Sequence, residues 1–224
     1  MGDVVAAERL SATQASLFAP DSAGPIDHER TGGLAVVVDD GFGSVERIRL
    51  DEHSWVDHVH GWLSGDDELM RYLMTNVDWE QRSRWMYDRR VQEPRLTAEY
   101  PVIDQAPHAV LHYVTDALSA HYETPFTRLW MNWYRDNQDG TSWHADHWAE
   151  KLDHAVIPVL SLGATRRFLI KPNAGGRSKI FEARSGDLIV MGGRCQRDHK
   201  HSVPKQKTAA GPRVSLNFSA AHRP

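Results

Sequence analysis

Residues 156–172 have the sequence VIPVLSLGATRRFLIKP, and this stretch decides the fold. It contains two short apolar segments, 156–162 and 167–171, and the turn residue Gly163 ends the first. Short apolar segments bounded by turn residues are typical of β-strands. We therefore predict two consecutive strands here.

The same pattern continues on both sides of this stretch. We predict further strands at 129–134, 179–183, 188–191 and 213–218, with turns rich in Gly, Pro, Asn and Asp between them. Several short strands at roughly regular spacing are typical of a sandwich or a barrel. The earlier part of the chain differs, because apolar residues recur at helical spacing in 56–78 and 107–122, and a short strand is expected at 34–38. The fold class is therefore mainly β with flanking helices (α+β).

Length and composition indicate one globular domain with an extension. Of the 224 residues, 41% are apolar and 25% are charged, an ordinary balance for a globular protein. Residues 1–30 are rich in small and polar residues, so we expect a mobile tail followed by a domain at 31–224. No long apolar run and no secretory signal are visible. The single cysteine, Cys195, fits the reducing cytoplasm.

A histidine and a carboxylate lie two residues apart at His144 and Asp146, and His201 follows far downstream. Alternate residues of a strand point to the same side, so a strand would direct the pair to one site. Two imidazoles and one carboxylate form the ligand set of a non-haem iron site, which leaves three positions open for a chelating cosubstrate and dioxygen. Spacing alone does not choose the second histidine, because His199 and His201 share a strand face.

Basic residues are unevenly distributed along the chain. The formal net charge of −4 argues against a nucleic-acid partner, because phosphate binding usually shows as a basic surface. However, Arg and Lys gather at 82–95 and 166–179, and local basic stripes can hold a phosphate backbone. The alternative is that these side chains are scattered and solvated.

Taken together, the motifs resemble those of the AlkB family of Fe(II)- and 2-oxoglutarate-dependent dioxygenases. The resemblance covers about residues 60–218 and rests on the segments 94–98, 132–134, 144–146, 161–163, 186–188, 201–204 and 212–218. It implies a double-stranded β-helix (jelly-roll) core at about 101–224 and an N-terminal substrate lid at about 31–100. It also implies that His144, Asp146 and His201 bind Fe(II), and so selects His201 over His199.

The resemblance further implies that Asn132, Tyr134 and Arg213 hold 2-oxoglutarate. A dicarboxylate needs a fixed cation, and arginine offers a bidentate fork. Two positions depart from the family pattern. Ser219 stands where the family usually has a second arginine, which predicts weaker cosubstrate binding or compensation by another group. Trp148 stands where many DNA-repair members have an acidic residue, so base preference is left open.

The reaction that the resemblance implies is oxidative demethylation of 1-methyladenine and 3-methylcytosine in DNA, with release of formaldehyde, succinate and CO2. A base in a duplex must be extruded to reach the metal, and extrusion needs an aromatic platform and cations for the phosphates. Residues 84–90 supply both kinds of side chain. We expect Tyr87 or Trp85 to stack on the base, with Trp148 and Arg95 as further substrate contacts.

The predicted tail contains Gln14-Ala15-Ser16-Leu17-Phe18, which resembles the pentapeptide that bacterial polymerases and repair proteins use to bind the sliding clamp. Leu17 and Phe18 would fill an apolar pocket, and Gln14 would hydrogen-bond at its rim. A chance apolar cluster is the competing interpretation.

Two other functions stay open at this point. An oxygenase with the same core could act on RNA, a protein side chain or a small metabolite, an alternative favoured by Trp148, Ser219 and the acidic net charge. A non-catalytic jelly-roll binding module is the second, and the intact His144, Asp146 and His201 argue against it.

Overall fold

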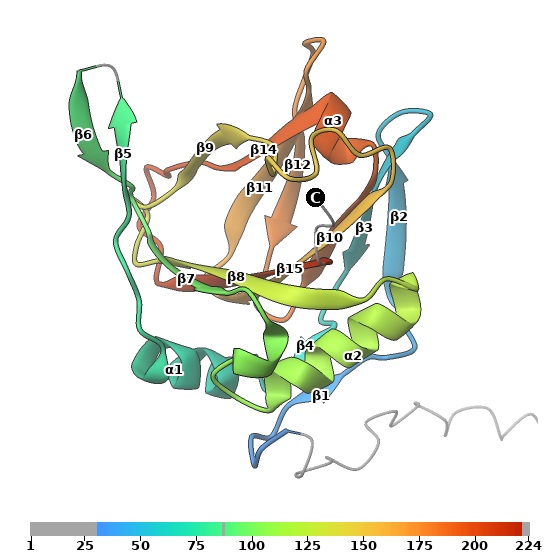
Figure 1. Ribbon diagram of the computed structural model, residues 1–224, viewed down its shortest axis with the longest axis vertical. Helices are drawn as coiled ribbons and strands as arrows, with labels where there is room; N and C mark the ends of the chain where they lie inside the picture. Colours follow the sequence, from blue (N-terminus) through green and yellow to red (C-terminus); the bar gives the residue numbers. More distant parts are fainter. Residues whose placement is uncertain (1–30, 87, 221–224) are drawn as a thin grey trace, which may run out of the picture.

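The computed structural model describes residues 31–86 and 88–220, except the side chain of Met86. Two antiparallel sheets face each other, and helices cover the outer side of the larger one (Figure 1). The predicted mainly β fold with flanking helices is confirmed. The large sheet has seven strands in this order: β2 (Val45–Arg49), β3 (Ser54–Val59), β13 (Leu188–Gly193), β10 (Ala155–Gly163), β15 (Arg213–Ala220), β8 (Phe126–Tyr134) and β7 (Leu96–Tyr100).

The smaller sheet has four strands and closes the sandwich. Their order is β12 (Lys179–Ala183), β11 (Arg166–Pro172), β14 (His199–Val203) and β9 (Thr141–His144). Two further strand pairs stand apart, β1 (Val37–Val38) with β4 (Leu63–Ser64) and the hairpin of β5 (Ser83–Met86) with β6 (Arg89–Gln92). The strands predicted from residue 129 onward are all present.

Strand β10 shows how the sequence produces two cores. Ile157 and Val159 pack between the two sheets, whereas Leu160 and Leu162 pack beneath the helices, and all four are at most 3% exposed. Because both faces of the strand are covered, almost every position must be apolar. This explains the continuous apolar run at 156–162.

The helices α1 (Asp66–Asn76) and α2 (Val110–Tyr122) lie against the outer face of the large sheet (Figure 1). Leu69, Leu73, Val114 and Leu118 are fully buried there, and each contributes about 1.5–3 kcal/mol through burial. The predicted helix at 107–122 is confirmed, beginning at Val110. A 3-10 helix (Ile103–Gln105) and a short helix α3 (Cys195–Asp198) complete the elements, and no helix in the described part is long and apolar enough to cross a membrane.

The predicted helix at 56–78 is wrong over its first half, where the chain forms β3, a turn and β4 before α1 begins. Strand β3 pairs with β2 and β13 along its two edges, and its faces pack into different cores through Val56 and Val59, so its apolar residues lack clean alternation. Gly61 and Gly65 then turn the chain with φ values of 59° and 78°, a conformation that favours glycine. Strand β2 was not predicted, because this edge strand is mostly exposed and polar.

The region 31–100 contributes to more than one part of the fold. Its strands β2, β3 and β7 belong to the large sheet, whereas the β5–β6 hairpin projects away from the sandwich (Figure 1). The division into a lid at 31–100 and a core at 101–224 stays a prediction. The predicted mobile tail and clamp-binding peptide with Gln14, Leu17 and Phe18, and the predicted stacking residue Tyr87, lie outside the described residues.

Candidate metal and cosubstrate site

Strands β9 and β14 lie side by side and bring the two distant histidines together, with His144 opposite His201 in the register. Strand β9 ends at His144, so Asp146 lies in the following loop and not, as expected, on the same strand. The loop is held in place because the backbone N–H of Asp146 donates a hydrogen bond to the buried side chain of Gln196, 2.8 Å away. The three side chains converge through two strands and one fixed loop.

The donor atoms of this cluster face one another at short range. The Asp146 Oδ1 atom lies 3.9 Å from His144 Nε2 and 4.0 Å from His201 Nε2. His144 Nδ1 lies 2.9 Å from the carbonyl oxygen of Ser142. A proton on Nδ1 satisfies that carbonyl, and it leaves the Nε2 lone pair free for a metal.

Burial prepares the cluster for a cation. The pKa of the His201 imidazole lies well below its usual value because the ring is buried and His144 is close, so the ring is neutral near pH 7, the form that can bind a metal. Burial also raises the pKa of the Asp146 carboxyl group, although His144 opposes this shift. A divalent cation between the three side chains would stabilise the carboxylate that burial disfavours.

His199, the alternative left open by spacing, does not join the cluster. It is 4% exposed, and its Nε2 atom lies 3.7 Å from Asp51 Oδ2 in a different hollow of the surface. The geometry therefore brings His201, and not His199, to Asp146.

The cluster lies in the wall of a cavity of about 540 Å³, and Arg213 lies deeper in the same cavity. Arg213 is 1% exposed, and its Nη2 atom donates a hydrogen bond to Ser161 Oγ at 2.8 Å. Its Nε and Nη1 atoms lack a well-formed hydrogen bond among the described residues, and the groups that act on its charge are Tyr134 and Arg166, with no carboxylate among them. A buried guanidinium without an acidic partner is costly unless a ligand supplies the carboxylate, so these residues fit a dicarboxylate cosubstrate.

Comparison with known families gives the cavity its context. The model of the 2OG-Fe(II) oxygenase superfamily matches residues 57–219. The chain belongs to that superfamily. Its predicted class, a dioxygenase with Fe(II) and 2-oxoglutarate, is thereby confirmed, whereas the roles of individual residues stay predictions.

Relatives support the resemblance to AlkB. The chain is 31% identical over 180 residues to the mouse protein named alpha-ketoglutarate-dependent dioxygenase alkB homolog 3, which covers 71% of this chain and 63% of that protein. It is 32% identical over 118 residues to Arabidopsis thaliana DNA oxidative demethylase ALKBH2, covering 42% of this chain and 37% of the relative. The chain thus spans less than two thirds of the length of these relatives.

The solved structure of OsALKBH1 has the same fold. It superposes with a TM-score of 0.54 at 15% identity and covers 79% of this chain and all of its own length. Together with the matched superfamily, this confirms the predicted jelly-roll core, and the AlkB resemblance rests on the relatives above.

The other predicted cosubstrate residues of this 2OG-Fe(II) oxygenase also line the cavity. The ring of Tyr134 lies 5.2 Å from the Arg213 guanidinium, and its hydroxyl group is 2.9 Å from Thr141 Oγ1. Asn132 is engaged by the protein itself: its Oδ1 atom accepts hydrogen bonds from Arg95 and Trp130, and its Nδ2 atom donates one to Ser215.

The predicted substrate residues fall into two places. Arg95 and Trp148 line the cavity, as does Ser219 at the position of the absent second arginine. Arg95 also pairs with Glu93 at 2.9 Å. Trp85 instead lies on the β5–β6 hairpin, 73% exposed and outside the cavity lining. The structure therefore does not bring Trp85 to the metal cluster.

Sequence reasoning missed Arg166, which we had grouped with basic surface residues. Arg166 is 1% exposed and donates hydrogen bonds to the carbonyl oxygens of Asp136, Asp139 and Pro204 at 2.8–3.0 Å. These bonds tie the turn before β9 to the end of β14, the two strands that carry His144 and His201. Strand alternation is the signal that identifies it, because Arg166 and the buried Phe168 are two residues apart and so lie on the same face of β11.

Proposed function

We propose that this chain is an oxidative demethylase that removes N-methyl groups from 1-methyladenine and 3-methylcytosine in DNA. The observation that carries the proposal is the buried Arg213, without an acidic partner among the described residues, in the same cavity as His144, Asp146 and His201. The names of two relatives, an AlkB homolog 3 and a DNA oxidative demethylase, support the choice of nucleic acid.

The side chains would act as positioning groups. When bound, Fe(II) and 2-oxoglutarate would use O2 as the oxidant: one oxygen atom would enter succinate as CO2 is lost, and the other would oxidise the methyl group, which leaves as formaldehyde. Arg213 binds one carboxylate of the cosubstrate, while Ser161 and the Tyr134 ring fix the direction of its guanidinium. Phe168 and Trp148 form apolar parts of the cavity wall and reduce the access of water to the reacting methyl group.

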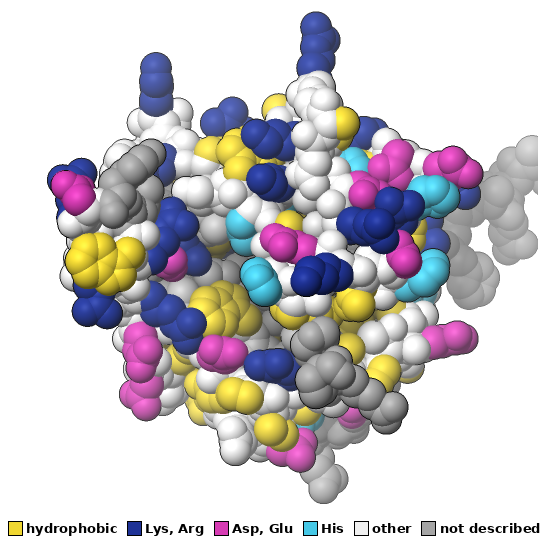
Figure 2. All heavy atoms as spheres, turned by 45° about the horizontal axis from the view of Figure 1, so that its top comes forward, with side chains coloured by type: hydrophobic (Ala, Val, Ile, Leu, Met, Phe, Trp, Pro, Cys, Tyr) yellow, Lys and Arg dark blue, Asp and Glu magenta, His cyan; other side chains and the backbone are white. Residues whose placement is uncertain are grey.

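Basic side chains outside the cavity support a phosphate-bearing substrate. Figure 2 shows Lys and Arg side chains over the β5–β6 hairpin on the left and on the projection where β11 turns into β12. Arg84, Arg89 and Arg90 are exposed on the hairpin, beside the exposed Trp85. Cations next to an aromatic ring suit a nucleic-acid strand, because the phosphates and the bases are bound by different groups.

The test compares oligonucleotides of one sequence that carry a single 3-methylcytosine, a single 1-methyladenine or no modification, each as DNA and as RNA. We expect the full chain, with Fe(II) and 2-oxoglutarate, to release one formaldehyde for each methylated base repaired and one succinate for each formaldehyde. The Asp146→Ala variant should release neither. Equal succinate release with methylated and unmodified DNA would contradict the proposal.

A second set of variants tests the hairpin. Arg89→Gln with Arg90→Gln should weaken oligonucleotide binding and flatten its dependence on salt, because each lost phosphate contact lowers the salt slope by roughly one. Arg49→Gln with Arg71→Gln, a matched pair of exposed arginines away from the hairpin, should change neither. A hairpin variant with unchanged binding would remove the β5–β6 hairpin from the proposed interface.

The second candidate is an oxygenase of the same core that acts on RNA, protein or a small metabolite. Trp148 in the cavity wall favours it, because an apolar ring replaces the acidic side chain expected to face a base. Demethylation of the RNA oligonucleotide faster than its DNA counterpart would select the RNA alternative.

Clamp binding and a cytoplasmic location are also part of the proposal, and both have support from the sequence alone. The peptide with Gln14, Leu17 and Phe18 would bind a bacterial sliding clamp in the cytoplasm. Leu17→Ala with Phe18→Ala should abolish retention on immobilised clamp and leave turnover of short oligonucleotides intact. Equal retention of the variant and the unchanged chain would rule the peptide out.

A further inference from the structure

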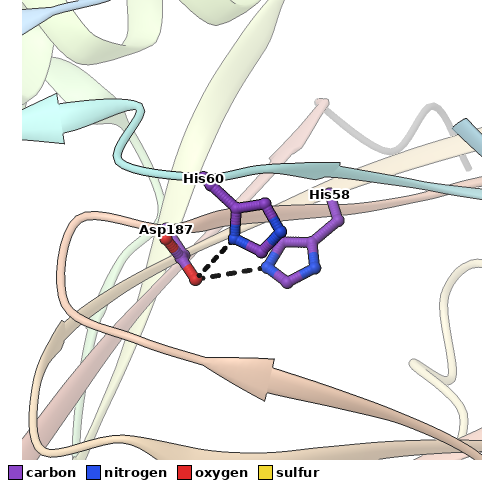
Figure 3. Close-up of side chains that lie close together, drawn as sticks. All are labelled: His58, His60 and Asp187. Carbon is purple, nitrogen blue, oxygen red and sulfur yellow. Dashed lines mark hydrogen bonds and ion pairs between the residues drawn. The ribbon is translucent and has the colours of Figure 1, made fainter. Parts of the chain in front are cut away.

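A second group of two histidines and one aspartate lies apart from the cavity. Figure 3 shows His58 on β3, His60 in the turn that follows, and Asp187 just before β13, with both rings directed at one carboxylate oxygen. The Oδ2 atom of Asp187 is 3.2 Å from His58 Nε2 and 3.3 Å from His60 Nδ1. None of the three residues lines the cavity that contains His144.

These distances match those between ligands of one small metal ion. Zinc bonds of about 2.0–2.1 Å at tetrahedral angles place two ligand atoms about 3.3–3.4 Å apart. The potential donor atoms of all three side chains lie within 4.8 Å of one another. Two imidazoles and a carboxylate are a common donor set for zinc.

The charge of the group also favours a cation. Asp187 is 3% exposed, and its only ion-pair partners among the described residues are the two histidines. A buried carboxylate beside two imidazole rings can supply the negative charge that a divalent metal ion needs.

Backbone N–H groups hold the Asp187 carboxylate in place, and the His60 side chain is open to solvent. The N–H groups of Gly61 and Arg184 donate to Asp187 at 2.9 and 3.2 Å. The side chain of His60 is 49% exposed, whereas that of His58 is 7% exposed. An ion can therefore enter past His60, and water can fill a fourth position there.

We propose that His58, His60 and Asp187 form a second metal site, which takes a divalent transition metal such as Zn²⁺. The ion would join the turn after β3 to the turn before β13. The backbone of Asp187 bonds to that of Ser161, whose hydroxyl accepts the hydrogen bond of Arg213. A metal here would thus stiffen the end of the sandwich against which the cosubstrate anchor rests.

The test uses Co²⁺, which occupies zinc sites and absorbs visible light strongly when tetrahedral. The full chain is stripped with a chelator and titrated as the unchanged protein, as His144→Ala, as His60→Gln and as the double variant. We expect two equivalents of Co²⁺ for the unchanged protein, one for each single variant and none for the double variant. The tetrahedral absorption should be lost with His60→Gln.

A thermal measurement gives a second readout. In the His144→Ala background, Zn²⁺ should raise the unfolding temperature, and His60→Gln should remove this rise by weakening Zn²⁺ binding at least about 100-fold. The matched control is His53→Gln, which changes another half-exposed histidine whose ring lies 3.9 Å from the Glu52 carboxylate and outside the proposed site, and it should retain the rise. Gln can still donate a hydrogen bond to Asp187. The His60→Gln variant should therefore lose metal binding and keep most of the stability of the metal-free fold.

The proposal is overturned if His144→Ala binds no Co²⁺, or if His60→Gln binds as much as the unchanged protein. Either result would leave the three residues as a hydrogen-bonded link between two turns.

Discussion

The chain contains two groups of two histidines and one aspartate, and they differ in how completely the protein satisfies the carboxylate. Asp187 accepts hydrogen bonds from two backbone N–H groups and lies 3.2–3.3 Å from both rings. No described group donates a hydrogen bond to the carboxylate of Asp146, and its histidines lie 3.9–4.0 Å away. Both groups have the chemistry of metal ligands, but only one is already part of the hydrogen-bonded fold.

This difference predicts which property each group controls. A carboxylate with many donors stabilises the folded chain even without a metal, whereas a partly buried carboxylate without donors, as at Asp146, destabilises it until a ligand binds. Changes at Asp146 should therefore alter activity and leave stability intact. Changes at Asp187 should lower stability and leave activity intact.

The largest expected effect is that of Asp146→Ala. We expect succinate release to fall to background, because the metal loses its only carboxylate ligand. The free energy of unfolding without metal should stay equal or rise, since burial raises the pKa of this carboxyl group and thus disfavours its charge. Urea unfolding of the metal-free protein measures this, and a large loss of stability would show that Asp146 is structural.

Two equally buried arginines give the next contrast, since Arg213 and Arg166 are both 1% exposed and both lie beside Tyr134. Arg213→Met should weaken 2-oxoglutarate binding by about 2–5 kcal/mol, which is at least roughly 30-fold. Arg166→Met should instead lower the free energy of unfolding by about 3 kcal/mol or more, because three carbonyl oxygens lose their donors. Cosubstrate titration and urea unfolding of both variants test the pair.

The contrast fails if Arg213→Met unfolds the protein or if Arg166→Met leaves its stability unchanged. Arg213→Lys is a useful intermediate, because lysine keeps the charge and lacks the bidentate fork.

A smaller effect is expected for Asp187→Asn. The pKa of Asp187 in the folded protein is about 2, below its ordinary value of 3.8. A depressed carboxyl pKa stabilises the fold above the ordinary value, and this contribution disappears as the pH falls through the folded value. The variant should lose about 2 kcal/mol of stability at pH 7, and this difference should shrink between about pH 4 and pH 2. Denaturant titrations at several pH values measure it, and a difference that does not change with pH would refute the assignment.

The smallest effect concerns Ser219, which lines the cavity opposite Arg128 in the strand register. Ser219→Arg should tighten 2-oxoglutarate binding by no more than about fivefold, because a partly exposed ion pair contributes about 1 kcal/mol at most. Ser219→Gln controls for side-chain size. Equal affinities of the two variants would mean that another group already compensates for the absent arginine.

The sequence predicted the strands of the sandwich because each is bounded by turn residues, as β10 is by Gly163. It also indicated that His144 and His201 meet, since they lie on strands that neighbour each other in this fold. Their roles as ligands, and those of Asn132, Tyr134 and Arg213, stay predictions that the variants above test.

Other features depend on contacts between distant parts of the chain. Residues 56–59 have the apolar spacing of a helix, and their pairing with β2 and β13 makes them a strand. The pairing with β13 also brings His58 to Asp187, which is 129 residues away in the sequence. No local sequence motif therefore predicts the group of His58, His60 and Asp187. The sequence places Arg166 among other basic residues and does not reveal that it is buried. Its partners are three backbone carbonyl oxygens, and backbone contacts between distant segments cannot be predicted from residue types.

The β5–β6 hairpin, finally, contributes no residue to either hydrophobic core within the described part of the chain. Substitutions there cost the fold little, whereas most residues that line the cavity lie on strands of the sandwich. If the hairpin binds the substrate as proposed, changes in it alter that binding and leave the residues around His144 and Arg213 in place, so the hairpin is the part of the chain in which to vary binding first.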